Sequence, residues 1–211
     1  MKNLILLLSF LPLMAYAEVN NLDLEKIQAK IHSNPVFKNT LDQCPADQKL
    51  SDGIKTTKTY FKKQQSCQNN IKSCYAKCLD KDGYACYFTA LELQSANYKI
   101  DAEKLFQKGC EAGVPTACTN RASGIEFYAQ QALPIQQNQC ITKAFKQTCD
   151  MNDPWGCTMY ASKLISGIEP QIDYQKALKI LNKSCQLAQD HPACIQSIEL
   201  KQYILNTMKK K

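Results

Sequence analysis

The chain has 211 residues, of which 45% are hydrophobic and 21% are charged, and its formal net charge is +7. The basic excess favours acidic partners or an anionic surface, but the sequence lacks clustered arginines interleaved with aromatic residues, which argues against nucleic acid. Twelve cysteines without one Cys-x-x-Cys spacing predict disulfides rather than a zinc site. We therefore expect no metal and no cofactor.

The first residues have the pattern of a secretory signal peptide, which we assign to residues 1–17. Lys2 supplies a positive charge, and residues 4–13 form an apolar run that is too short to span a bilayer. Ala15-Tyr16-Ala17 then has the small-x-small form of a cleavage site. Cleavage near Ala17 predicts an exported mature chain, periplasmic or secreted, that does not insert into the membrane.

Residues 18–69 are predicted to form an irregular helical cap at the N-terminal end of the fold. Residues 22–33 and 55–66 have helical patterns, and prolines and an Asp-Gly turn separate them. Terminal units of helical solenoids are often atypical, because they cover an apolar end that would otherwise be exposed. We expect this segment to have that role.

Residues 70–211 contain a repeating unit, with roughly 32 to 39 residues between equivalent cysteines. Apolar residues lie eight, five and four positions before the first cysteine of a unit, as in Ala102, Leu105 and Phe106, and this spacing places them on one helix face. A proline or glycine stands two or three positions before the second cysteine, which is typical of the first turn of a helix. The sequence therefore predicts an all-α fold, an αα-hairpin solenoid of four repeats, whose last helix caps the C-terminal end.

The paired cysteines should close each hairpin with a disulfide. One cysteine ends a helix and the other begins its antiparallel neighbour, so their Cβ atoms can approach within the roughly 3.5–4.5 Å that the bond needs. The four predicted bonds are Cys78–Cys86, Cys110–Cys118, Cys149–Cys157 and Cys185–Cys194.

Cys44, Cys67, Cys74 and Cys140 lie outside these pairs. Cys74 holds the position that Phe106 has in the next repeat, so we expect it to face inward and to bond to Cys44 or Cys67. Two alternatives stay open for Cys140, which is either a free thiol or one partner of a long-range disulfide.

The repeats resemble Sel-1-like repeats, which are related to tetratricopeptide repeats. The resemblance is carried by residues 98–122 and, in the last repeat, by residues 173–177, 183–185 and 192–194, and it covers roughly residues 73–203. The cysteine pairs are similar to those of the disulfide-rich branch of this family, the Helicobacter cysteine-rich proteins. The chain departs from the family after the second cysteine, where the usual Leu-Gly is replaced, for example by Arg121-Ala122.

The resemblance implies a scaffold whose concave surface holds a protein or peptide partner in the cell envelope, for example in the assembly or regulation of an envelope machine. The second helix of each hairpin would line that surface. The outward positions implied for it are Tyr87, Thr119, Asn120, Thr158, Tyr160, Lys163, Gln196 and Lys201. The sequence leaves the oligomeric state open.

The alternative function is weak binding of β-lactams or cell-wall material, or a β-lactamase-like activity, because some cysteine-rich relatives are described in this way. The residues do not support it, since the chain has neither Ser-x-x-Lys nor Gly-x-Ser-x-Gly, the usual settings of an activated serine. Its two histidines, His32 and His191, have no neighbours that mark a general base. We therefore expect no enzyme and assign no catalytic residue.

Overall fold

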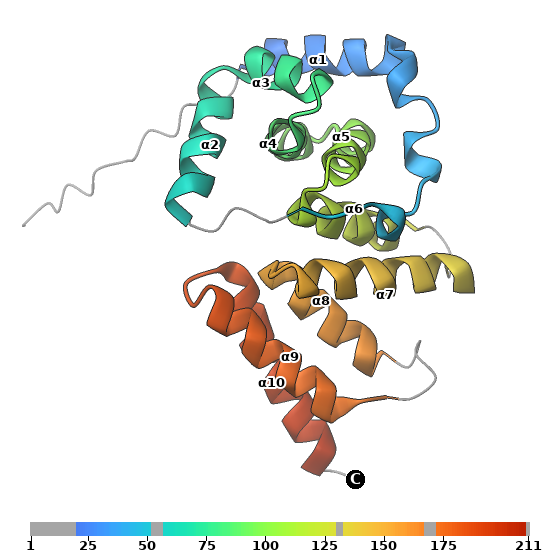
Figure 1. Ribbon diagram of the computed structural model, residues 1–211, viewed down its shortest axis with the longest axis vertical. Coiled ribbons are helices and arrows are strands. Elements are labelled where there is room, and N and C mark those ends of the chain that lie inside the picture. The colour runs from blue at the N-terminus through green and yellow to red at the C-terminus, as the bar shows by residue number, and fades with distance from the viewer. Residues whose placement is uncertain (1–19, 52–56, 130–132, 167–171, 210–211) are drawn as a thin grey trace, which may run out of the picture.

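The computed structural model describes residues 20–51, 57–129, 133–166 and 172–209 (Figure 1). The proposed signal peptide, residues 1–17, lies outside this part of the chain. Within it every regular element is helical, which agrees with the predicted all-α class. The α-helices are α1 (Asn21–Ser33), α2 (Thr57–Asn69), α3 (Ile71–Leu79), α4 (Gly83–Ser95), α5 (Lys99–Glu111), α6 (Pro115–Phe127), α7 (Ile135–Asp150), α8 (Pro154–Ile165), α9 (Tyr174–Leu187) and α10 (Pro192–Lys209).

Disulfides join α3 to α4, α5 to α6, α7 to α8 and α9 to α10. These are the four predicted pairs, and the Cα atoms within each pair are 4.3 to 4.6 Å apart. Each helix from α3 to α10 packs against the next along the chain, and second helices also contact one another, α4 with α6, α6 with α8 and α8 with α10. The hairpins therefore follow one another in space in the order of the sequence, from α3 to α10 (Figure 1).

The turns of the first three hairpins share one backbone conformation. Lys81, Gly113 and Asn152, each three residues after the first cysteine of its pair, have positive φ angles of 69°, 88° and 63°. The next backbone N–H in each turn bonds to a carbonyl five residues earlier, and this pairing satisfies groups that the helix end leaves free. Because the turn is the same three times, it brings the cysteines together in the same way.

The apolar stripes predicted on the first helices are buried where they face neighbouring helices. Ala102, Leu105 and Phe106 of α5 are fully buried, as are Ile141, Ala144 and Phe145 of α7. The first two hairpins approach closely at Gly109, where a Cβ atom would lie 3.0 Å from the carbonyl oxygen of Gly83 and 2.9 Å from the Cβ of Ala117. That approach depends on small residues.

The N-terminal segment does more than cover one end. Helix α1 packs on α3, α4 and α5, and α2 packs on α3 and α4. Between them, the short 3₁₀ turns η1 (Pro35–Phe37), η2 (Thr40–Asp42) and η3 (Pro45–Asp47) run past α5 and α6 to α7 (Figure 1). The segment therefore braces three hairpins from the side.

The four remaining cysteines join this segment to the hairpins. Cys74 bonds to Cys67, one of its two predicted partners. Cys140 bonds to Cys44 across 96 residues, so the free-thiol alternative is wrong and the long-range alternative is right. All twelve cysteines are paired.

Hydrogen bonds to backbone carbonyls also attach the N-terminal segment to the α5–α6 hairpin. The N–H and hydroxyl of Ser51 donate to the Gly113 carbonyl at 2.9 and 3.0 Å. The Arg121 guanidinium donates to the Leu41 carbonyl at 2.9 Å. These contacts use polar groups of the α5–α6 hairpin that its own helices leave free.

Six disulfides indicate an oxidising, extracytoplasmic location, because thiols stay reduced in the cytosol. Among the helices that the structure describes, none is both long and apolar enough to cross a membrane.

The two kinds of disulfide should contribute unequally to stability. The chain-entropy relation gives about 4.7 kcal/mol for the long loop closed by Cys44–Cys140 and about 2.5 kcal/mol for the short loop closed by Cys185–Cys194. We expect Cys44→Ala/Cys140→Ala to lower the free energy of unfolding more than Cys185→Ala/Cys194→Ala, as measured by urea denaturation. Equal losses would contradict the expected dependence on the length of the closed loop.

Candidate functional site

The structure contradicts the outward orientation expected for most of the second-helix residues. Five of the eight are buried, and the other three are half-buried or exposed. The buried ones are Tyr87, Thr119, Thr158, Tyr160 and Lys163; Asn120 and Lys201 are half-buried, and Gln196 is exposed. These residues do not form one accessible binding surface.

The buried residues instead connect neighbouring hairpins. The Thr119 hydroxyl donates to Asp153 Oδ2 at 2.6 Å and lies 2.9 Å from Thr148 Oγ1. The Thr158 hydroxyl lies 2.7 Å from Ser197 Oγ. Because α4, α6 and α8 are each covered by the hairpin that follows, positions on them that would face a groove in an isolated hairpin become internal here.

Two other predicted binding residues also make contacts between hairpins. Lys163 of α8 is buried and forms an ion pair with Glu126 of α6. The ammonium of Lys176 on α9 lies 5.4 Å from the centroid of the Tyr160 ring, within the range of a cation–π contact. The polar and aromatic groups of the second helices therefore hold the stack together.

Asp153 is the most deeply buried acid of this network. It caps α8 by accepting a hydrogen bond from the Gly156 N–H at 2.8 Å. Burial raises the pKa of its carboxyl to about 6, although the bonds from Thr119 and Gly156 act in the opposite direction. Gly156 has no room for a side chain, since a Cβ there would overlap the Thr148 hydroxyl.

A second buried pair joins α5 to α6. Arg121 Nη1 donates to Glu103 Oε2 at 3.1 Å, and both side chains are buried. Burial raises the pKa of Glu103 to about 7, while the Arg121 charge lowers it. A Cβ on Gly124 would overlap the carboxylate atoms of Glu103, so a larger residue there would displace this side chain.

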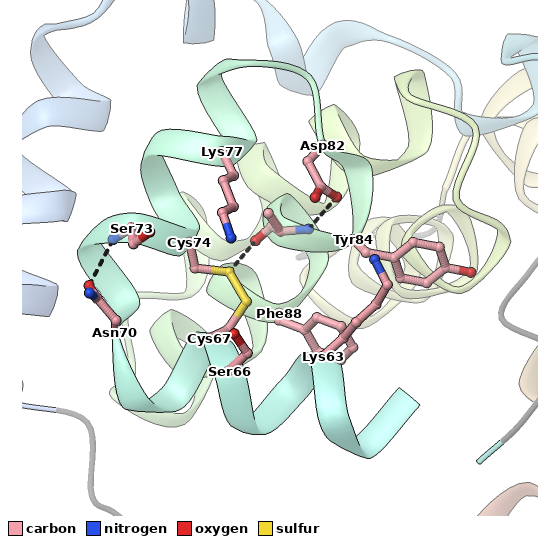
Figure 2. Close-up of a pocket in the computed structure, with 11 residues that line it drawn as sticks. Lys63, Ser66, Cys67, Asn70, Ser73, Cys74, Lys77, Asp82, Tyr84 and Phe88 are labelled. Atoms are coloured by element: carbon pink, nitrogen blue, oxygen red, sulfur yellow. Dashed lines mark hydrogen bonds between the residues drawn. A yellow bond between two sulfur atoms is a disulfide. The ribbon is translucent and has the colours of Figure 1, made fainter. Parts of the chain in front are cut away.

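The candidate functional site is a recess of about 280 Å³ between α2, α3 and the start of α4 (Figure 2). Apolar and polar side chains from these helices surround the Cys67–Cys74 disulfide. The lining residues are Lys63, Ser66, Cys67, Asn70, Ser73, Cys74, Lys77, Asp82, Tyr84, Ala85 and Phe88. None of them was among the residues that the sequence singled out for binding.

The floor of the recess is apolar and its rim is basic. Phe88 is fully buried below it, and the Lys63 ammonium lies 5.5 Å from the centroid of the Tyr84 ring. Figure 2 shows Lys63 running along that ring and the disulfide joining the helices that carry Lys63 and Lys77. Both lysines are exposed, so their charges remain accessible to a ligand.

The acid and the amide of the recess are already used within the fold. Asp82 caps α4 by accepting from the Ala85 N–H at 3.1 Å, and Asn70 caps α3 by accepting from the Ser73 N–H at 3.0 Å. Asp82 still adds a carboxylate to the rim, so the recess offers two ammonium groups, one carboxylate, two serine hydroxyls and an aromatic floor. This arrangement suits a group that combines an apolar body with a carboxylate.

The two histidines are engaged in separate contacts. His32 Nε2 lies 2.9 Å from Asp101 Oδ1, and this pair holds α1 to α5. His191 packs its ring edge-on against Trp155 at 6.2 Å between centroids, and burial lowers its pKa. Among the described residues, no group of three or more His, Cys, Asp or Glu side chains is placed to hold a metal ion.

Comparisons of the chain with protein-family models, with curated proteins and with solved structures find no match.

The buried carboxyl of Asp153 should make stability depend on pH. Between about pH 4 and pH 6 the unfolded chain loses this proton while the folded chain keeps it, so the free energy of unfolding falls as pH rises, by about 3 kcal/mol for this group. Asp153→Asn should make this fall shallower without removing it, because the raised pKa of Glu103 adds a fall of the same sign over an overlapping window; urea denaturation at each pH measures the profile.

Asp150→Asn is the matched control, because Asp150 lies at the end of α7 and is exposed. Its pH profile should stay parallel to that of the unmodified protein. A slope between pH 4 and pH 6 that Asp153→Asn leaves unaltered would contradict the assignment.

Proposed function

We propose that the protein is a periplasmic or secreted interaction scaffold, a solenoid of the Sel-1-like and tetratricopeptide kind, that binds a protein or peptide partner. Support for the scaffold comes from four hairpins, each closed by a disulfide and packed on the next. Such stacks offer extended surfaces on a rigid frame, because each repeat contacts only its neighbours. The six disulfides support export.

The recess between α2, α3 and α4 is the observation that carries the proposal. It is an open hollow with an apolar floor and a basic rim, and the Cys67–Cys74 bond fixes two of its three walls to each other. A rigid site loses little entropy when a ligand binds, which favours recognition of a short segment.

The chemistry of the recess indicates a partner with an aromatic or aliphatic side chain next to a carboxylate. The Tyr84 and Phe88 rings would contact the apolar part, and Lys63 and Lys77 would lie near the negative charge. Exposed ion pairs contribute only about 0.2–1 kcal/mol each and Phe88 is fully buried, so we expect a modest affinity whose selectivity the lysines set.

A random-peptide display library selected on the purified protein tests this proposal. We expect the enriched sequences to place an acidic residue within two or three positions of an aromatic one. Lys63→Glu/Lys77→Glu should abolish that enrichment, because the rim would then repel carboxylates. The affinity of a consensus peptide, measured by calorimetry, should fall at least about tenfold in this variant.

The matched control is Lys62→Glu. Lys62 is also on α2 but lies outside the recess lining, and the substitution changes the charge by as much as each of the two lysine substitutions does. It should leave both the consensus and the affinity unchanged. Selection of peptides without acidic residues would contradict the assignment of this site. So would a loss of affinity in the control equal to that in Lys63→Glu/Lys77→Glu.

A further inference from the structure

The recess between α2, α3 and α4 has a disulfide among its lining side chains. Cys67 of α2 and Cys74 of α3 both belong to the lining and are bonded to each other (Figure 2). None of the four hairpin disulfides lines this recess, because each of them joins the two helices of its hairpin at their turn. A molecule that binds in the recess would therefore contact the Cys67–Cys74 bond.

Each cysteine of this bond has a lysine one helical turn away that lines the same recess. Lys63 precedes Cys67 by four residues on α2, so the two share a helix face. Lys77 follows Cys74 by three residues on α3, and Figure 2 shows its side chain extending toward the disulfide. A nearby ammonium group stabilises a thiolate, the form of cysteine that attacks or leaves in disulfide exchange.

The bond can open without dismantling the stack of hairpins. Among the described side chains of α2, Cys67 alone is buried, while Tyr60, Gln64 and Gln68 are half-buried. The hairpin disulfides and the long-range disulfide to α7 do not involve α2. Opening the Cys67–Cys74 bond therefore releases one peripheral helix and leaves every hairpin closed.

We propose that the Cys67–Cys74 disulfide exchanges with a dithiol of a partner protein, so that the recess is a site of thiol–disulfide exchange. This inference rests on the proposed function in that the partner reaches the disulfide through the same recess. Lys63 and Lys77 outnumber the single carboxylate of Asp82 at the rim, which leaves a net positive charge. That charge favours an acidic segment that carries two cysteines.

The exchange takes place in two balanced steps. A thiolate of the partner attacks Cys67 Sγ, the bond to Cys74 breaks, and its electron pair leaves on Cys74 as a thiolate that takes up a proton. The second thiolate of the partner then attacks the partner's own sulfur in this mixed disulfide, and Cys67 leaves as a thiolate and is protonated in turn. The partner dithiol is oxidised to a disulfide, and Cys67 and Cys74 are reduced to two thiols.

Cys67 is the sulfur that is open to attack. Cys67 is 7% exposed and Cys74 is 3% exposed. Cys74 Sγ lies 3.6 Å from the Ala85 carbonyl oxygen, so the backbone of α4 covers it, and that oxygen can accept the S–H of a reduced Cys74. Lys77 lies on the same helix as the thiolate that leaves first, and a stabilised thiolate leaves faster.

Reduction by dithiothreitol tests the exchange without any peptide recognition. Samples of the oxidised protein are alkylated with iodoacetamide at successive times, and mass spectrometry identifies the cysteines that have been freed. We expect Cys67 and Cys74 to be freed at least about tenfold faster than Cys185 and Cys194, although Cys185 is the more exposed residue. Equal rates, or earlier reduction of any other disulfide, would overturn the proposal.

Removal of the two charges should slow this reaction. Lys63→Gln/Lys77→Gln should lower the rate at Cys67–Cys74 roughly threefold to tenfold, because exposed charges have modest effects on a neighbouring thiolate. Lys62→Gln, on α2 outside the recess lining, is the matched control and should leave the rate unchanged. Circular dichroism should show the same helix content in all variants. A rate that the double substitution leaves unaltered would count against the proposal.

An acidic peptide with a single cysteine captures the first step. Iodoacetamide blocks the freed Cys74, and mass spectrometry should then find the peptide attached to Cys67. Attachment to Cys74, or to a cysteine outside the recess, would contradict the assigned attack.

A peptide without cysteine, with an acidic residue near an aromatic one, separates this inference from the proposed peptide site. If calorimetry shows that it binds while the Cys67–Cys74 bond opens no faster than the other disulfides, exchange is wrong and the peptide site stands. If the bond opens first but no such peptide binds, the peptide site is wrong and exchange stands.

Discussion

The whole arrangement depends on the covalent closure of each helical hairpin at its turn. A pair of helices of 9 to 18 residues buries little apolar surface by itself, and here each pair is buried only by its neighbours. A bond across the turn fixes the angle and register of the two helices before any neighbour is present. The apolar stripes then lie where the next hairpin can cover them.

The side brace complements this serial construction. The hydrophobic core has two clusters, one containing Phe37 and the other containing Ala46, so the same short segment contributes to both. The Cys44–Cys140 bond and the Ser51 contact with Gly113 attach that segment to separate hairpins. Contacts between residues far apart in the sequence therefore reinforce a stack that would otherwise be held by local ones.

The interior of the stack contains buried polar contacts both between and within hairpins. The Thr119–Asp153 bond joins the second hairpin to the third, and the Glu103–Arg121 pair joins the two helices of the second hairpin, at places where an apolar contact would also fill the space. Buried groups of this kind are costly unless every partner is in place, and they can favour one register of stacking over its alternatives. In this chain they explain why acids with raised pKa values occur far from the recess.

The sequence predicted the hairpins well because their signals are local. Cysteine spacing and the prolines at 115, 154 and 192 mark turns and helix starts, and the helices begin at those prolines. The orientation of the second helices was predicted wrongly, because helical periodicity does not tell a groove from a contact with the next hairpin, as Thr119 and Thr158 show. The recess was missed because α2 does not match the repeat, and only its packing on α4 brings Lys63 to Tyr84.

The connectivity of the cysteines also bears on how the chain matures as it enters an oxidising compartment. If Cys44 and Cys140 are set aside, every other cysteine bonds to the next one along the chain, so these bonds can form in the order of emergence. Cys44 must instead remain unpaired while the six cysteines that lie between it and its partner emerge. Cys44 is therefore the cysteine whose pairing most needs a disulfide isomerase, since its mispairing would displace the neighbouring bonds.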